Sequence, residues 1–165
     1  MVDHLAQSAQ VVACRIAYRM MNQLGDETLA QVPGGIVTRF SKSGRIAAMA
    51  YNYPPEMEAS LPVSNTLAAA DAIDNSGSAR KFTTNISQVP ARGSFIVETL
   101  DKEHGDAVPA WEAMGKPEPP NRQQTELLRK QAWATKKRIV KADASGKLHI
   151  EFTLPTWSLV SIRQM

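Results

Sequence analysis

The chain has 165 residues, a length that suits one globular domain with an appendage. Hydrophobic residues make up 43% and charged residues 21% of it, which is ordinary for a soluble protein with its own core. The net charge of +3 is too small by itself to indicate a nucleic-acid-binding protein. A single cysteine, Cys14, excludes disulfide bonds within the chain.

The first predicted element is a helix from Ser8 to Leu24. Apolar side chains recur in it at i, i+3 and i+4, with Arg15 and Arg19 between them. Ser8 is placed to cap this helix, and Gly25 to end it as a left-handed residue. Because the two arginines interrupt the apolar run, the segment fits neither a membrane span nor a signal peptide. We expect the apolar stripe to pack on the protein's own core.

From Gln31 onward the hydrophobic period changes from that of a helix to that of strands. A hairpin closed by Gly44 is predicted first, and a helix capped by Asn121 and ending near Ala134 interrupts the later strands. The predicted strands are Gly35 to Phe40, Arg45 to Tyr53, Lys81 to Ser87, a strand opening at Gly93, Arg138 to Lys141, Lys147 to Leu154 and Thr156 to Arg163. Short strands separated by turns indicate an antiparallel sandwich.

The predicted fold is therefore mainly β: an antiparallel β-sandwich with an N-terminal helix and a short helix inserted near 121–134. We divide the chain into residues 1–30, which hold the N-terminal helix, and residues 31–165, which form the sandwich.

The stretch from Gly93 to Gly115 has the most distinctive pattern. A strand with alternating side chains runs into a charged turn that contains His104, and a short helical segment follows, with Trp111 and Met114 spaced i, i+3. We expect Trp111 to be a core anchor, with Met114 and the strand of Phe95 as its neighbours.

This stretch resembles the C-terminal domain of glycoside hydrolase family 39, the β-xylosidase-like enzymes. In that family a strand ends in Ile-Asp, followed by His-Ser-Asn and by Trp-x-x-Met-Gly-x-Pro. The corresponding residues here are Leu100, Asp101, His104, Gly105, Asp106, Trp111, Met114, Gly115 and Pro117. The change of Ser-Asn to Gly105-Asp106 is a departure from the family pattern.

Three further segments match in the same order. Residues 18–29 resemble the last helix of the family's catalytic barrel, residues 46–54 a strand ending in Tyr-Asn-Tyr, and residues 152–160 a closing pair of strands. The resemblance implies a fragment: the last barrel helix and the accessory sandwich of a protein whose activity is retaining hydrolysis of β-xylosides or related glycosides.

Retaining glycosidases need two carboxyl groups about 5–5.5 Å apart. The glutamate motifs of the family's barrel are not in this sequence, and we interpret Glu98, Glu103 and Glu112 as solvated surface carboxylates. Whether the chain is an enzyme stays uncertain; alone, we expect it to be inactive. No cofactor is expected, and His104 among acidic residues is a weak metal signal without a second histidine or cysteine at ligand spacing.

Trp133, His104 and Asp106 are the candidate carbohydrate contacts, which leaves a stand-alone carbohydrate-binding module as an alternative function. Basic residues around Trp133 are the best argument for a nucleic-acid module, but they follow a helix and a strand edge, where lysines keep edges soluble. That run comprises Arg129, Lys130, Lys136, Lys137, Arg138 and Lys141.

Two protein partners are expected, a glycosidase barrel or a second copy of the chain. We read residues 25–34 as a short linker that limits how far the N-terminal helix can swing back onto the sandwich, which favours a homodimer through that helix. The sequence does not identify a cellular compartment.

Overall fold

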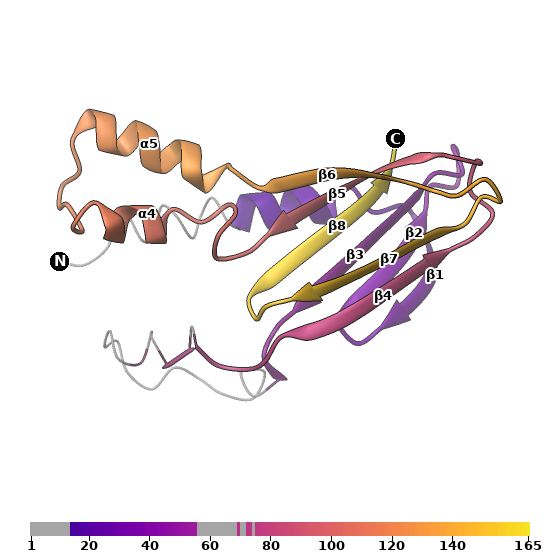
Figure 1. The fold of residues 1–165 in the computed structure, drawn as a ribbon, viewed down its shortest axis with the longest axis horizontal. Helices are drawn as coiled ribbons and strands as arrows, with labels where there is room; N and C mark the ends of the chain where they lie inside the picture. Colours follow the sequence, from indigo (N-terminus) through magenta and orange to yellow (C-terminus); the bar gives the residue numbers. More distant parts are fainter. Residues whose placement is uncertain (1–13, 56–68, 70–71, 74) are drawn as a thin grey trace.

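The computed structural model of the protein describes residues 14–55, 69, 72–73 and 75–165. It is a mainly β fold in which two antiparallel sheets pack face to face, as the sequence predicts (Figure 1). No helix among these residues is long and apolar enough to cross a membrane.

The larger sheet has six strands in the order β1-β2-β3-β8-β5-β6, and the smaller has two, β4-β7. Neighbouring strands are antiparallel in both sheets. The strands are β1 (Glu27–Val32), β2 (Gly35–Arg39), β3 (Ile46–Asn52), β4 (Arg80–Ile86), β5 (Ser94–Leu100), β6 (Lys136–Lys141), β7 (Leu148–Leu154) and β8 (Ser158–Gln164). The predicted hairpin is therefore confirmed as β2 and β3, and each later predicted strand is found within a few residues of its expected bounds.

The core lies between the two sheets. Alternate residues of each strand point inward, so that Phe95 and Val97 of β5 and Val160 and Ile162 of β8 meet Ile150 and other residues of the small sheet. Phe95 is fully buried. Phe82 and Phe152 stack at the rim of this core, with ring centroids 5.7 Å apart.

The N-terminal helix, helical in residues 14–21, folds back over the outer face of the six-stranded sheet (Figure 1). Its Ile16 and Met20 are fully buried, and the backbone N–H of Gly25 donates to Thr38 Oγ1 of β2 at 2.7 Å. The expectation that a short linker would hold the helix away from the sandwich is wrong, because the chain turns directly from the helix into the sheet. Ser8, the predicted cap, lies outside the described residues.

The predicted linker also contains a strand. β1 forms the outer edge of the large sheet, with a register shift between Thr28 and Ala30 that interrupts its alternation. Gly25 was expected to be left-handed but is not among the residues with positive φ. A Cβ on Gly25 would lie 2.3 Å from the carbonyl carbon of Arg39, so the close approach of two backbones requires the glycine.

Two helices form a separate layer at one end of the sandwich: α4 (Val108–Ala113) and α5 (Arg122–Ala132) (Figure 1). Asn121 caps α5 with a capping box, as the sequence predicts. Trp111 packs with Met114 against Leu128 and Ala132 in this helical cluster, and its Nε1–H donates to Pro117 O at 3.1 Å. Its expected neighbour Phe95 belongs to the sandwich core instead, so Trp111 anchors a second, smaller core.

Candidate functional site

Glu98 of β5 is the one buried carboxylate among the described residues, with 1% of its surface exposed. It points to the outer face of the sheet, where Arg19 of the N-terminal helix forms a two-pronged ion pair with it, at 2.6 and 3.0 Å. Thr135 donates its hydroxyl to Glu98 Oε1 at 2.6 Å, and Lys137 Nζ lies 3.5 Å from the same oxygen. The interpretation of Glu98 as a solvated surface carboxylate is wrong, since the carboxylate is buried and three side chains from other segments bind it. We call Glu98, Arg19, Thr135 and Lys137 the Glu98 cluster.

The electrostatics of the Glu98 cluster hold the carboxylate in its charged form. Burial alone would raise the pKa of Glu98, but the hydrogen bonds from Arg19 and Thr135 and the positive charges of Arg19 and Lys137 outweigh it and lower the pKa to about 2. The same hydrogen bond to Glu98 raises the pKa of Arg19. A general acid needs the opposite shift, toward a protonated carboxyl near neutral pH. Glu98 is therefore set up to hold a helix on a sheet.

Gly105 supports the Glu98 cluster from the neighbouring turn. Its φ is +92°, and a Cβ there would lie 2.5 Å from Leu100 Cδ1 and 3.3 Å from Thr135 Cγ2. The methyl end of Ile16 is next in distance, at 3.7 Å from the same point. Gly105, one of the two residues that differ from the family pattern, thus lies where the N-terminal helix, β5 and the start of β6 meet.

Two of the three candidate carbohydrate contacts lie in this turn, on either side of Gly105. His104 Nδ1 lies 2.8 Å from Asp101 Oδ1, and Asp106 Oδ1 accepts the backbone N–H of Val108 at the start of α4. Trp133 is the C-cap residue of α5 and is 50% exposed. Thr135, two residues after Trp133, lies beside Gly105, because a Cβ added to this glycine would be 3.3 Å from Thr135 Cγ2. The three candidates therefore belong to one end of the molecule. Of the three, Trp133 presents the largest open face.

The other carboxylates of the initial set lie in solvent. Glu103 is exposed in the turn, and Glu112 is exposed and pairs with Lys116 at 2.9 Å. Among the described residues, no group of three or more histidine, cysteine, aspartate or glutamate side chains is arranged to hold a metal ion.

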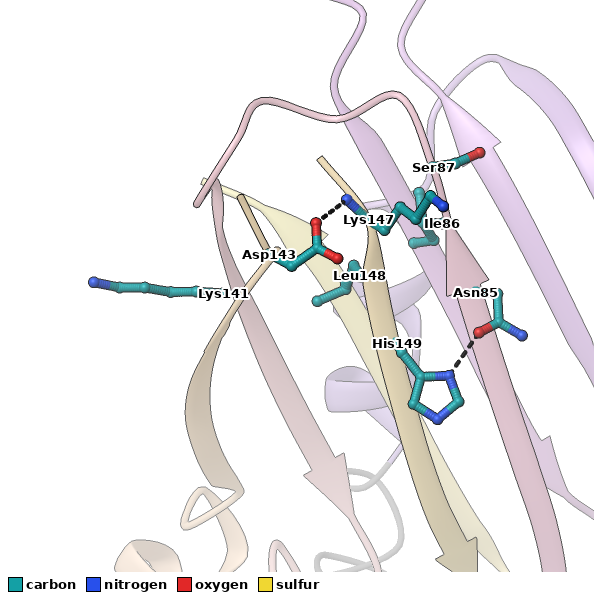
Figure 2. A pocket seen from close by; sticks show the side chains of 8 residues that line it. All are labelled: Asn85, Ile86, Ser87, Lys141, Asp143, Lys147, Leu148 and His149. Carbon is teal, nitrogen blue, oxygen red and sulfur yellow. Dashed lines mark hydrogen bonds between the residues drawn. The ribbon is translucent and has the colours of Figure 1, made fainter. Parts of the chain in front are cut away.

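A hollow that sequence reasoning missed lies at the far end of the small sheet (Figure 2). It has a volume of about 440 Å³ and is lined by residues at the ends of β4, β6 and β7 and in the turn before β7. His149 Nδ1 lies 2.6 Å from Asn85 Oδ1 across these strands, and Asp143 Oδ1 accepts the backbone N–H of Lys147 at 2.9 Å. The bond from Lys147 N–H, followed by the bond from the Ser145 hydroxyl, lowers the pKa of Asp143.

The polar side chains that line this hollow stabilise a turn and do not form a reactive site. The Asp143 carboxylate is occupied by the backbone and hydroxyl of its own turn. Figure 2 shows the side chain of Lys141 extending away from the other lining residues. The partners of His149 are Asn85 and, at 3.8 Å, Glu151, and none of these residues is a nucleophile that it could activate.

Comparison with solved structures identifies the fold. A glycoside hydrolase family 39 enzyme from Xanthomonas axonopodis pv. citri matches with a TM-score of 0.66 and 18% identity, over 90% of this chain and 29% of that chain. A monomeric β-xylosidase from Caulobacter crescentus matches with a TM-score of 0.62 and 18% identity, over 90% of this chain and 29% of that chain. A bacterial orthologue of human α-L-iduronidase matches with a TM-score of 0.57 and 18% identity, over 88% of this chain and 26% of that chain.

No protein-family model and no curated protein matches the sequence. The resemblance to family 39 seen in the sequence is confirmed at the level of the fold: the chain has the fold of a part of these enzymes. It spans less than a third of the length of each.

Proposed function

We propose that this chain is a non-catalytic accessory module of a family 39-like glycoside hydrolase, and that it packs against a catalytic barrel through its N-terminal helix. The observation that carries the proposal is the coverage of the fold: 90% of this chain matches, but only 29% of the Xanthomonas enzyme does. The activity of the whole protein would be retaining hydrolysis of β-xylosides or related glycosides.

The state of the carboxylates supports a non-catalytic role. A retaining glycosidase needs one carboxyl group that stays protonated and a second about 5–5.5 Å away. The buried Glu98 is ionised and tied to Arg19, while Glu103 and Glu112 are exposed and belong to different segments, a turn and a helix. These three described glutamates therefore do not provide the two contrasting environments that the reaction requires.

The outward side of the N-terminal helix supports a packing role. Ile16 and Met20 face the sandwich, whereas Tyr18 and Met21, spaced i, i+3 on the helix, are 65% and 38% exposed. Tyr51, on the outer face of β3, is 44% exposed. Large apolar side chains on one side of a molecule are typical of an interaction surface.

Turnover of an aryl β-xyloside tests the absence of catalysis. We expect the purified chain to give the buffer rate. Turnover that follows the protein through purification and is lost in Glu103→Gln or Glu112→Gln would contradict the proposal.

Sedimentation over a wide dilution series tests the alternative partner, a second copy of the chain. We expect a monomer at every concentration, which would leave the exposed side of the N-terminal helix available to a catalytic barrel. A concentration-dependent dimer that Tyr18→Glu with Met21→Glu abolishes, and that Lys42→Glu on the β2–β3 turn leaves intact, would assign this surface to self-association. Neutral xylo-oligosaccharides test the stand-alone carbohydrate-binding function: a site that binds them without any barrel would favour that alternative.

A further inference from the structure

The basic charge of the chain is concentrated in one short segment. Between Arg122 and Lys141 there are seven basic residues and one acidic residue, a net charge of +6, whereas the whole chain carries +3; the remaining residues therefore sum to −3. In the fold this segment is α5 followed by β6, which is an edge strand of the large sheet. Figure 1 shows α5 and β6 running along one long edge of the molecule. We call this the α5–β6 edge.

Most of these charges have no counter-ion among the residues that the structure describes. On the α5–β6 edge, Arg122 pairs with Glu126 and Lys137 with Glu98. The other five side chains are exposed and form no ion pair with any residue that the structure describes: Arg129, Lys130, Lys136, Arg138 and Lys141.

An open aromatic ring lies in the middle of this charge. Trp133, 50% exposed, follows Arg129 by four residues on α5, so the two share a face of the helix, and Lys136 begins β6 three residues later. Ile139 of β6 is 62% exposed. Lysines alone are enough to keep an edge strand soluble. The exposed indole of Trp133 adds a flat apolar surface among these cationic side chains, and solubility does not require it.

From this arrangement we propose that the α5–β6 edge binds an acidic polysaccharide, with a sugar ring stacked on Trp133 and uronate carboxylates paired with the flanking basic side chains. Unpaired cations along an edge match a linear polyanion, and like charges oppose pairing of this edge with a second copy. The choice of a sugar over another polyanion rests on the proposed function. Binding is measured on the isolated chain, so a failure here leaves the turnover and sedimentation tests unaffected.

Two polymers that differ only in charge provide the test: a glucuronoxylan, and the same glucuronoxylan after chemical reduction of its carboxyl groups. At about 50 mM salt we expect the acidic polymer to bind at least tenfold more tightly than the reduced one, and to lose affinity at about 200 mM. Equal binding of both polymers, or no binding of either, would overturn the proposal.

Matched variants locate the site. Arg129→Glu with Lys130→Glu and Lys141→Glu should weaken binding by about tenfold or more. The control, Lys42→Glu with Arg45→Glu and Lys81→Glu, makes the same change in net charge at exposed sites in the β2–β3 turn and on β4, and should retain most of the affinity. Equal losses in the two triple variants would mean that net charge alone attracts the polymer, and would overturn the assignment of a site.

Trp133→Ala should weaken binding about fivefold, and Trp133→Tyr should restore most of the affinity, because stacking needs a flat ring.

Binding of a DNA duplex of random sequence tests whether the edge prefers a nucleic acid to an acidic polysaccharide. Tighter binding of the duplex than of glucuronoxylan at about 200 mM salt, unaffected by Trp133→Ala, would show a nucleic-acid surface and overturn the polysaccharide proposal.

Discussion

Strands β5 and β6 are hydrogen-bonded neighbours, yet their charged side chains are in opposite situations. Glu98 on β5 is buried and satisfied by three partners, whereas Lys136, Arg138 and Lys141 on β6 are exposed and unpaired within the described chain. The difference follows from what covers each strand: the N-terminal helix covers β5 at Glu98, while β6 is the edge of the sheet. A charge in the covered position contributes to the fold, and a charge at the edge remains available for a partner.

Removing the buried carboxylate should have the largest effect. Glu98→Ala breaks the ion pair with Arg19 and leaves Thr135 without its acceptor, which we expect to lower the free energy of unfolding by about 3 kcal/mol. Urea denaturation measures it. Glu103→Ala, in an exposed position, is the control and should change the free energy by less than about 0.5 kcal/mol. Equal effects would mean that the Glu98 cluster does not hold the helix.

Lowering the pH should remove the contribution of the Glu98 carboxylate to the free energy of unfolding without a mutation. The pKa of Glu98 in the folded state, about 2, lies below its ordinary value, so the folded protein binds fewer protons than the unfolded chain in this range. The stabilisation is complete above about pH 4.5 and is lost as pH falls toward 2. The stability difference between the wild type and Glu98→Gln should shrink over this window. A constant difference would show that Glu98 stabilises by shape instead of charge.

Gly105→Ala should weaken the Glu98 cluster from the neighbouring turn. The new Cβ would be strained at φ +92° and would clash with Leu100, and we expect a loss of about 2 kcal/mol. Gly44→Ala is matched to it, because Gly44 also has positive φ (+69°) but no atom within 4 Å of the Cβ position. It should cost only the backbone strain, about 1 kcal/mol. The difference in thermal stability between Gly105→Ala and Gly44→Ala measures the cost of the clash with Leu100. Equal losses of stability in the two variants would argue against such a clash.

Two lysines on the outer side of β6 give the smallest expected difference. Lys137 is 3.5 Å from Glu98, whereas Lys141, four residues later on the same face, is unpaired in the described chain. Lys137→Ala should cost about 0.5 kcal/mol, and Lys141→Ala nothing measurable. If Lys141→Ala lowers the free energy of unfolding more than Lys137→Ala does, then the unpaired lysine, and not the paired one, stabilises the fold. Denaturation in low and high salt provides the measurement, since the Lys137 contribution should decrease as salt rises.

Local features of the sequence predicted much of this fold. Gly44 closes the β2–β3 hairpin with a positive φ, and Asn121 caps α5, because both roles depend on residues a few positions apart. β1 was missed because its bulge at residue 29 breaks the two-residue period by which strands are recognised. Gly25 was misassigned for a related reason: its partner, the backbone of Arg39, lies on another strand.

The Glu98 cluster could not be predicted, because Arg19 and Glu98 are 79 residues apart and no local pattern joins them. Trp111 was correctly recognised as a packing residue, but its neighbours were not, since α4 pairs with the later helix α5 and not with the strand before it. The exposed charges of the α5–β6 edge were visible as a run in the sequence. Their lack of counter-ions within the described part of the chain became clear only once the positions of its acidic side chains were known.

The place of β8 in the large sheet has a consequence for synthesis. β8 leaves the ribosome after the other strands of this sheet, yet it lies in the middle of the sheet and joins β3 to β5. Until it arrives, the hairpin strands on one side and the β5–β6 pair on the other have no shared neighbour, and each presents an unpaired edge. Pairings between strands so distant in sequence form slowly, and nascent chains with open edges are prone to aggregate. Expression of this protein should therefore be sensitive to chaperone supply and to small deletions within residues 158–164.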